Sequence, residues 1–119
     1  RADVCLVGNH DLVVLGELVV SDFNDEAAAA AIWTAEVLTE EARGFLAGLR
    51  PLAAQDGVDL FHASARDPVW EYVLSTLLAE LCLDVQEHRV CLIGHSHVAL
   101  SFGRQPGEPA TGETREGGR

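Results

Sequence analysis

The side chains best suited to metal chemistry occur at three places along this sequence, each directly after a short apolar run. They are an Asn-His pair, a lone histidine and a His-x-His pair: Asn9 with His10, then His62, then His95 with His97. An amide oxygen and neutral imidazoles suit intermediate cations such as Mn²⁺, Fe²⁺ or Zn²⁺. The pattern therefore indicates a metal site assembled from separate strand ends.

Each group also has a plain structural explanation. Asn-His-Asp at residues 9–11 follows a glycine and is an ordinary turn sequence, because Asn and Asp tolerate left-handed backbone. His62 alone fits a hydrogen-bonded histidine, and one His-x-His pair is weak evidence for a metal. Together they favour a site, since four of the five histidines follow or close apolar runs. His88 precedes its run, and we assign it no role.

Short strands must position these groups. Residues 4–7 and 90–93 read VCLV and VCLI, which suits buried parallel strands, and further strands are predicted at residues 58–61 and 97–102. Residues 12–20 are apolar but interrupted by Gly and Glu, and we predict a loop with some extended structure there.

Helices are predicted between the strands. Asn24 is an expected N-cap for a helix that reaches about residue 37, and Thr39 caps a second helix that ends before a proline. Asp67 begins a third helix, which continues to residue 81 and which the Ser-Thr pair at residues 75–76 could divide. Strands alternating with helices indicate an α/β structure, and open α/β sheets bind ligands at the carboxyl ends of their strands.

In order and spacing, these motifs resemble the calcineurin-like metallophosphoesterases. That family reads Asp-x-His, Gly-Asp-x-x-Asp, Gly-Asn-His-Asp/Glu, a lone His and then Gly-His-x-His. This sequence has Gly-Asn-His-Asp at residues 8–11, His62, and Gly-His-Ser-His at residues 94–97. The resemblance spans residues 2–102 and is strongest to small bacterial members. It implies a fragment of the family's layered α/β/β/α sandwich as a partial domain over residues 1–102.

The resemblance also implies a metal-binding role for four residues. Asn9, His62 and His95 would bind one ion of a two-metal site, and His97 would bind the other. The ions would be divalent: Mn²⁺, Fe²⁺ or Zn²⁺. In the family, two such ions hold the phosphoryl oxygens and activate water for in-line attack on phosphorus.

Two further residues would assist the reaction. His10 resembles the family's catalytic histidine, which stabilises charge beside the phosphate, and Asp11 would orient His10 through a hydrogen bond. The implied function is a metal-dependent phosphoester hydrolase, either a phosphodiesterase or a phosphatase. Substrates would be phosphoester small molecules or phosphoproteins.

The sequence departs from the family pattern at its first two motifs, because it contains neither Asp-x-His nor Gly-Asp-x-x-Asp. It carries only the later motifs. One alternative is therefore a non-catalytic metal- or phosphate-binding remnant of the same fold, and another is a plain α/β fragment. The family's later strands are also not evident, so open sheet edges are expected. Such edges favour self-association or a partner chain that covers them.

Composition narrows the class of protein. The chain has 119 residues, 48% of them hydrophobic, which suffices for the core of one small domain. Eight basic residues, all arginine, and 19 acidic ones give a net charge of 8 − 19 = −11, which disfavours nucleic acid and anionic membranes. No apolar run is long enough to span a bilayer, and no leader is recognisable, so we expect a soluble cytoplasmic protein. Residues 103–119 are polar and rich in glycine, which predicts a disordered tail.

Several other side chains carry expectations of their own. Cys5 and Cys91 are expected to point into the core, and with Cys82 they fit free thiols in a reducing compartment. Arg66 is expected to pair with a neighbouring acidic residue rather than a phosphate. The large aromatic residues of the helical patterns are expected in the core: Trp33, Trp70 and Tyr72.

Overall fold

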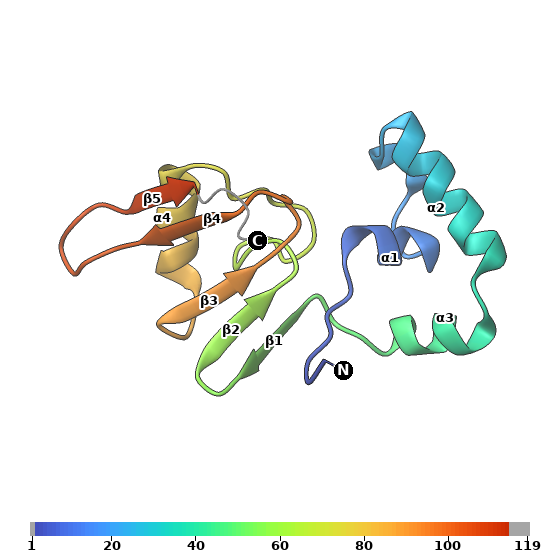
Figure 1. The fold of residues 1–119 in the computed structure, drawn as a ribbon, viewed down its shortest axis with the longest axis horizontal. Helices are drawn as coiled ribbons and strands as arrows, with labels where there is room; N and C mark the ends of the chain where they lie inside the picture. Colours follow the sequence, from blue (N-terminus) through green and yellow to red (C-terminus); the bar gives the residue numbers. More distant parts are fainter. Residues whose placement is uncertain (1, 115–119) are drawn as a thin grey trace. The chain divides into compact units, whose positions relative to one another are not determined.

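The computed structural model describes residues 2–114, which form two compact units (Figure 1). Among the described residues, the first unit covers residues 2–51 and the second covers residues 52–114. The first is helical, whereas the second contains the strands and one helix. The predicted partial domain over residues 1–102 stays a prediction.

Helices of the first unit begin at side-chain caps that the sequence identifies. The elements are α1 (Asn9–Val14), a 3₁₀ turn η1 (Val20–Asp22), α2 (Asp25–Val37) and α3 (Glu40–Ala47). Asn24 Oδ1 accepts a hydrogen bond from the Ala27 N–H at 2.8 Å, and Thr39 Oγ1 accepts one from the Ala42 N–H at 3.2 Å. Each cap satisfies one backbone donor of the first turn. The two predicted helices are therefore confirmed.

The segment before α2 differs from prediction. Residues 4–7 form no strand, which corrects the prediction from their apolar sequence. A strand requires a ladder of backbone hydrogen bonds, and here the Val7 N–H donates to the Arg50 carbonyl at 3.1 Å. Residues 9–14 are helical where a turn and a loop were predicted. Asp11 Oδ2 accepts from the Gly8 N–H at 2.8 Å at the start of α1, and Gly16 follows its end with φ of 79°.

The core of the first unit joins its helices. Val13, Val14 and Ala31 are buried, and partly buried apolar side chains pack around them. The Arg43 guanidinium donates to the carbonyl oxygens of Val14 at 3.2 Å and Ala35 at 2.9 Å. One side chain of α3 thereby satisfies carbonyl groups at the end of α1 and within α2.

The main sheet of the second unit has the order β1-β2-β3. Its strands are β1 (Leu52–Gln55), β2 (Val58–Phe61) and β3 (Val90–Ile93). The pair β2 and β3 is parallel, with Phe61 opposite Ile93, and confirms both predicted strands. The strand β1 was not predicted. It pairs with β2 in antiparallel fashion through Asp56 and Gly57, which have φ of 52° and 76°, as a tight Asp-Gly hairpin requires.

The remaining helix begins later than predicted. Asp67 Oδ1 accepts from the N–H groups of Val69 and Trp70, both at 3.1 Å, and so closes a local turn instead of starting a helix. Helix α4 (Thr76–Val85) starts after Ser75, whose Oγ accepts from the Leu78 N–H at 3.2 Å. The Ser-Thr pair therefore marks the true start of the helix.

A hairpin ends the described part of the chain. Strands β4 (Leu100–Gly103) and β5 (Thr111–Thr114) pair in antiparallel fashion. The predicted strand at residues 97–102 thus begins three residues later. Residues 111–114 are ordered where a disordered tail was predicted, because their backbone pairs with β4, and residues 115–119 of that tail lie outside the described residues. No helix within residues 2–114 is long and apolar enough to cross a membrane.

The core of the second unit lies under α4. Val73, Ala79 and Cys82 are buried there, and Phe102 of β4 packs against them. Phe102 lies opposite Gly112 of β5, where a side chain would meet the Phe102 ring at 2.6 Å. Glycine at this position therefore leaves room for the aromatic ring in the core.

Candidate metal centre

Two predicted ligands meet at the carboxyl ends of the parallel strands. His62 directly follows β2, and His95 follows β3 after one glycine. His62 Nε2 lies 3.2 Å from His95 Nδ1, and the two ring centroids are 4.9 Å apart at an interplanar angle of 61°. Both side chains are half-buried. Parallel pairing puts the two strand ends at one sheet edge, and that explains the meeting.

A tight turn aims His95. The Ser96 N–H donates to the Gly94 carbonyl at 2.8 Å, so His95 is the central residue of a three-residue turn, with φ of 68°. This positive-φ γ-turn is rare and strained, and such strain is typical of functional sites. His97 also has a positive φ, 58°, and is exposed. Both histidines therefore lie in the irregular segment between β3 and β4 and not in a strand.

Gly94 allows the close approach of the two strand ends. Its N–H donates to the His62 carbonyl at 2.9 Å. A Cβ at this position would lie 3.3 Å from that same carbonyl oxygen. The glycine of the Gly-His-Ser-His motif thus has a packing role beside the histidine pair.

The second ring nitrogen of His95 fixes its tautomer. His95 Nε2 lies 3.1 Å from the Trp70 carbonyl oxygen. A carbonyl oxygen only accepts, so Nε2 carries the proton and Nδ1 is the atom directed at His62. The Tyr72 ring stacks on the His95 ring, with centroids 4.0 Å apart and an interplanar angle of 19°. His95 is therefore held in both position and orientation.

The chemistry of this pair fits a divalent ion. Two nitrogen ligands bonded to one ion at about 2.1 Å lie roughly 2.9–3.4 Å apart in octahedral or tetrahedral geometry. The observed separation of 3.2 Å between the two imidazole nitrogens falls within that interval. Metal-binding histidines commonly donate their other N–H to a backbone carbonyl, as His95 does to Trp70. His62 and His95 are thus suitable as two adjacent ligands of one ion.

The other predicted residues are placed as follows. Asn9 is buried at the start of α1, Asp11 bonds the Gly8 N–H, and the His10 ring packs on Phe23 with centroids 4.5 Å apart. All three belong to the first unit, whereas His62, His95 and His97 belong to the second. Metal binding by Asn9, His62, His95 and His97, and the catalytic roles of His10 and Asp11, stay predictions.

The sequence reasoning missed a second polar cluster. Asp59, in the middle of β2, is buried, and its Oδ2 accepts from the N–H groups of Glu87 and His88, both at 2.8 Å. Its Oδ1 lies 2.7 Å from His88 Nδ1. Possible ligand atoms of these three residues lie within 4.8 Å of one another. The signal for this cluster was an aspartate inside an apolar strand, together with the histidine to which we assigned no role.

Hydrogen bonding alone accounts for the Asp59 cluster. The backbone N–H of His88 lowers the pKa of the Asp59 carboxyl most, and the His88 side chain lowers it further. The carboxylate therefore has donors for both oxygens, and it ties the loop before β3 to the centre of β2. We assign it a structural role.

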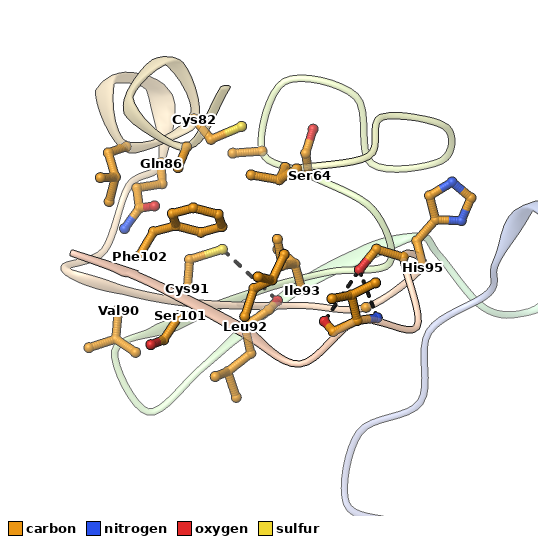
Figure 2. Close-up of a pocket in the computed structure, with 18 of the residues that line it drawn as sticks. Ser64, Cys82, Gln86, Val90, Cys91, Leu92, Ile93, His95, Ser101 and Phe102 are labelled. Carbon is orange, nitrogen blue, oxygen red and sulfur yellow. Dashed lines mark hydrogen bonds between the residues drawn. The ribbon is translucent and has the colours of Figure 1, made fainter. Parts of the chain in front are cut away.

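A cavity of about 620 Å³ is lined in part by the turn of residues 94–96. It lies between α4, β3 and β4, with His95 at one end and Gln86 and Val90 at the other (Figure 2). Most of its lining is apolar.

Two cysteines line this cavity. Burial raises the pKa of the Cys91 thiol to about 11. Burial is also the largest cause that raises the pKa of the Cys82 thiol, and the hydrogen bond with the Glu71 carboxylate is the next largest. Both thiols are therefore protonated at neutral pH.

Of the predictions for other side chains, one is confirmed and several are wrong. Arg66 Nη1 lies 3.6 Å from Glu71 Oε2, which confirms that Arg66 pairs with a neighbouring acidic residue. Cys5 is exposed, so its predicted core position is wrong, since residues 4–7 form no strand. Two of the aromatic residues predicted in the core are instead largely exposed: Trp33 at 63% and Tyr72 at 50%. Tyr72 precedes α4 and packs on His95.

Comparison with known proteins finds similar sequences and similar folds. The chain is 31% identical to a metallophosphoesterase of Sphaerobacter thermophilus, whose crystal structure superposes with a TM-score of 0.72 over 87% of this chain. A hypothetical protein of Pyrococcus horikoshii, 16% identical, shares the fold with a TM-score of 0.63 over 98% of the chain and 64% of its own length. An uncharacterised protein of Methanocaldococcus jannaschii is 34% identical over 100 residues, 78% of this chain. No protein-family profile matches the sequence.

The match covers only part of these relatives. The chain spans 42% of the length of the Sphaerobacter protein and 39% of the Methanocaldococcus protein.

Proposed function

Because the chain is related to the calcineurin-like metallophosphoesterases and forms a fragment of their α/β fold, we propose that it belongs to a metal-dependent phosphoester hydrolase. The reaction would be that of a phosphodiesterase or a phosphatase, with a two-metal site. The observation that carries the proposal is the 3.2 Å separation of His62 Nε2 and His95 Nδ1 at the ends of two parallel strands.

The proposed site assigns a task to each motif residue. Asn9, His62 and His95 would hold one ion, and His97 would contribute to the second. Divalent ions at such sites hold the phosphoryl oxygens and lower the pKa of bound water. Mn²⁺, Fe²⁺ and Zn²⁺ all suit amide and imidazole ligands.

Two residues of α1 would act on the substrate. His10 would stand beside the phosphate and stabilise its developing charge. Asp11 would orient His10, in addition to the hydrogen bond that it accepts from Gly8. A phosphoester small molecule or a phosphoprotein suits the site, whereas a chain of net charge −11 disfavours nucleic acid.

The proposal also includes a partner chain and a cellular location. Apolar residues of β3 are exposed, Leu92 at 60% and Val90 at 50%, which supports a second copy or a partner chain on this face. Cys5, Cys82 and Cys91 are free thiols, which suits a reducing, cytoplasmic location.

A hydrolysis assay tests the proposal. The chain is incubated with Mn²⁺ and either bis(p-nitrophenyl) phosphate or p-nitrophenyl phosphate, and nitrophenolate release is followed. We expect hydrolysis that requires Mn²⁺, with a rate at least about 100-fold lower in His10→Ala, because charge stabilisation at the phosphate is lost. His88→Ala is the matched control, since His88 lies in the separate Asp59 cluster and should leave the rate within about twofold.

Mn²⁺ binding without hydrolysis would favour the non-catalytic remnant instead. The absence of both Mn²⁺ binding and hydrolysis would contradict the proposed function.

A further inference from the structure

Glu71 lies between two residues that both touch His95. The carbonyl oxygen of Trp70 is 3.1 Å from His95 Nε2, and the ring of Tyr72 stacks on the His95 ring at 4.0 Å. One contact fixes the tautomer of His95, and the other fixes the plane of its ring. The placement of residues 70–72 therefore determines the tautomer and the ring orientation of His95.

The carboxylate of Glu71 is held from three sides. Ser64 Oγ donates to Glu71 Oε1 at 2.8 Å, and Cys82 Sγ of α4 lies 3.4 Å from the same oxygen. Arg66 Nη1 lies 3.6 Å from Oε2. The side chain of Glu71 is only 18% exposed, so these contacts replace most of its hydration.

Ser64 links the carboxylate to the rest of the loop. Its side chain is fully buried, and its single hydroxyl proton goes to the charged Glu71 oxygen rather than to the neutral Asp67 carbonyl 3.2 Å away. Ser64 Oγ also accepts a hydrogen bond from the Asp67 N–H at 2.9 Å. Asp67 Oδ1 in turn accepts from the Trp70 N–H. Hydrogen bonds thus connect Glu71, through Ser64 and Asp67, to Trp70, the residue whose carbonyl oxygen contacts His95.

We propose that Glu71 is a positioning residue for His95. Its carboxylate, fixed by Ser64, Cys82 and Arg66, holds the flanking residues so that the Trp70 carbonyl accepts a hydrogen bond from the Nε2–H group of His95. His95 then presents Nδ1 beside His62 Nε2. The link to metal binding rests on the proposed function, whereas the effect of Glu71 on the His95 tautomer does not.

The tautomer is measured on the metal-free chain at pH 8. Long-range ¹H–¹⁵N correlation spectra distinguish protonated from unprotonated ring nitrogens, and His95 is assigned by comparison with His95→Ala. In the wild-type chain we expect the proton on Nε2. In Glu71→Ala, and likewise in Ser64→Ala, we expect both tautomers to be populated. Glu71→Gln keeps an oxygen that accepts from Ser64 and should retain the wild-type spectrum.

Mn²⁺ affinity is the second readout. Loss of the groups that orient a metal-binding histidine typically weakens metal binding 10- to 100-fold, and we expect about this loss in Glu71→Ala. Glu80→Ala is the matched control, because Glu80 lies on α4 and its side chain approaches Arg104 at 3.9 Å. It should change neither the tautomer nor the affinity.

Two results would overturn the inference. One is a wild-type His95 with its proton on Nδ1, which needs no variant to observe. The other is a folded Glu71→Ala or Ser64→Ala chain that keeps the Nε2–H tautomer alone. If the wild-type chain bound no Mn²⁺, the proposed function would fail, while the tautomer spectra would still decide the role of Glu71.

Discussion

Asp59 and Glu71 are acidic side chains that are used for support rather than for exposed charge. Asp59 ties the loop before β3 to β2, and Glu71 ties the loop after β2 to α4. His62 begins the loop that Glu71 anchors, whereas the loop that Asp59 anchors precedes β3, at the strand end opposite His95. Of the two carboxylates, Glu71 therefore holds backbone beside the histidine pair, and Asp59 holds backbone at the other edge of the sheet.

The anchoring role of Asp59 predicts a pH-dependent stability. The folded-state pKa of Asp59 is lowered, chiefly by the His88 N–H, so its stabilising effect is present above its ordinary pKa of about 3.9 and is lost as pH falls through the folded value. At pH 7 we expect Asp59→Asn to lower the free energy of unfolding by about 1–3 kcal/mol. Urea titrations between pH 7 and pH 3 measure the difference from wild type.

The difference should shrink towards the acid end of that range. A gap between wild type and Asp59→Asn that stays constant from pH 7 to pH 3 would show that the charge of Asp59 contributes nothing.

Helix caps and tight turns can be identified from the sequence, because they depend on residues that are close together along the chain. Asn24 and Thr39 cap helices as predicted, because capping involves atoms three residues away. The Asp-Gly pair at residues 56–57 could have identified β1 by the same reasoning. Residues 4–7 were mistaken for a strand because their apolar sequence says nothing about whether a pairing partner exists.

Tertiary contacts limit how much of the site can be predicted from the sequence. The meeting of His62 and His95 followed from parallel pairing, which the alternation of strands and helices indicates. The contacts of Asp59 with His88 and of Glu71 with Ser64 and Cys82 join side chains of different elements or of an irregular loop. No spacing rule in the sequence specifies them.

The hairpin of β4 and β5 offers a test at the scale of the element. Ala at position 112 would place a methyl group 2.6 Å from the Phe102 ring and move that ring out of its core position. We expect Gly112→Ala to destabilise the chain by about 1–3 kcal/mol, measured by urea unfolding.

Gly103→Ala is the control in the same hairpin. A Cβ there would meet nothing within 4 Å, and we expect a change within about 0.5 kcal/mol. Equal effects of the two substitutions would contradict the proposed packing of Phe102 over Gly112.

In the molecule as a whole, the apolar strand β3 remains largely exposed. The sequence VCLI is typical of a strand that is covered on both faces, yet Leu92 is 60% exposed. We expect the chain to self-associate, with a sedimentation coefficient that rises with protein concentration.

Leu92→Glu should reduce that association. Leu77→Glu is the matched control, because Leu77 is 66% exposed on α4 and the substitution adds the same charge. Association that both variants weaken equally would assign the effect to net charge rather than to β3.

Metal binding by the histidine pair can be measured directly. The chain is dialysed against Mn²⁺, and bound metal is measured by mass spectrometry for wild type, His62→Ala, His95→Ala and the control His88→Ala. We predict that the wild-type chain binds Mn²⁺, that either substitution in the pair abolishes binding, and that His88→Ala retains it, because the facing nitrogens of His62 and His95 are 3.2 Å apart. Binding that survives His95→Ala, or that is lost only in His88→Ala, would place the metal at the Asp59 cluster or elsewhere and would contradict the account.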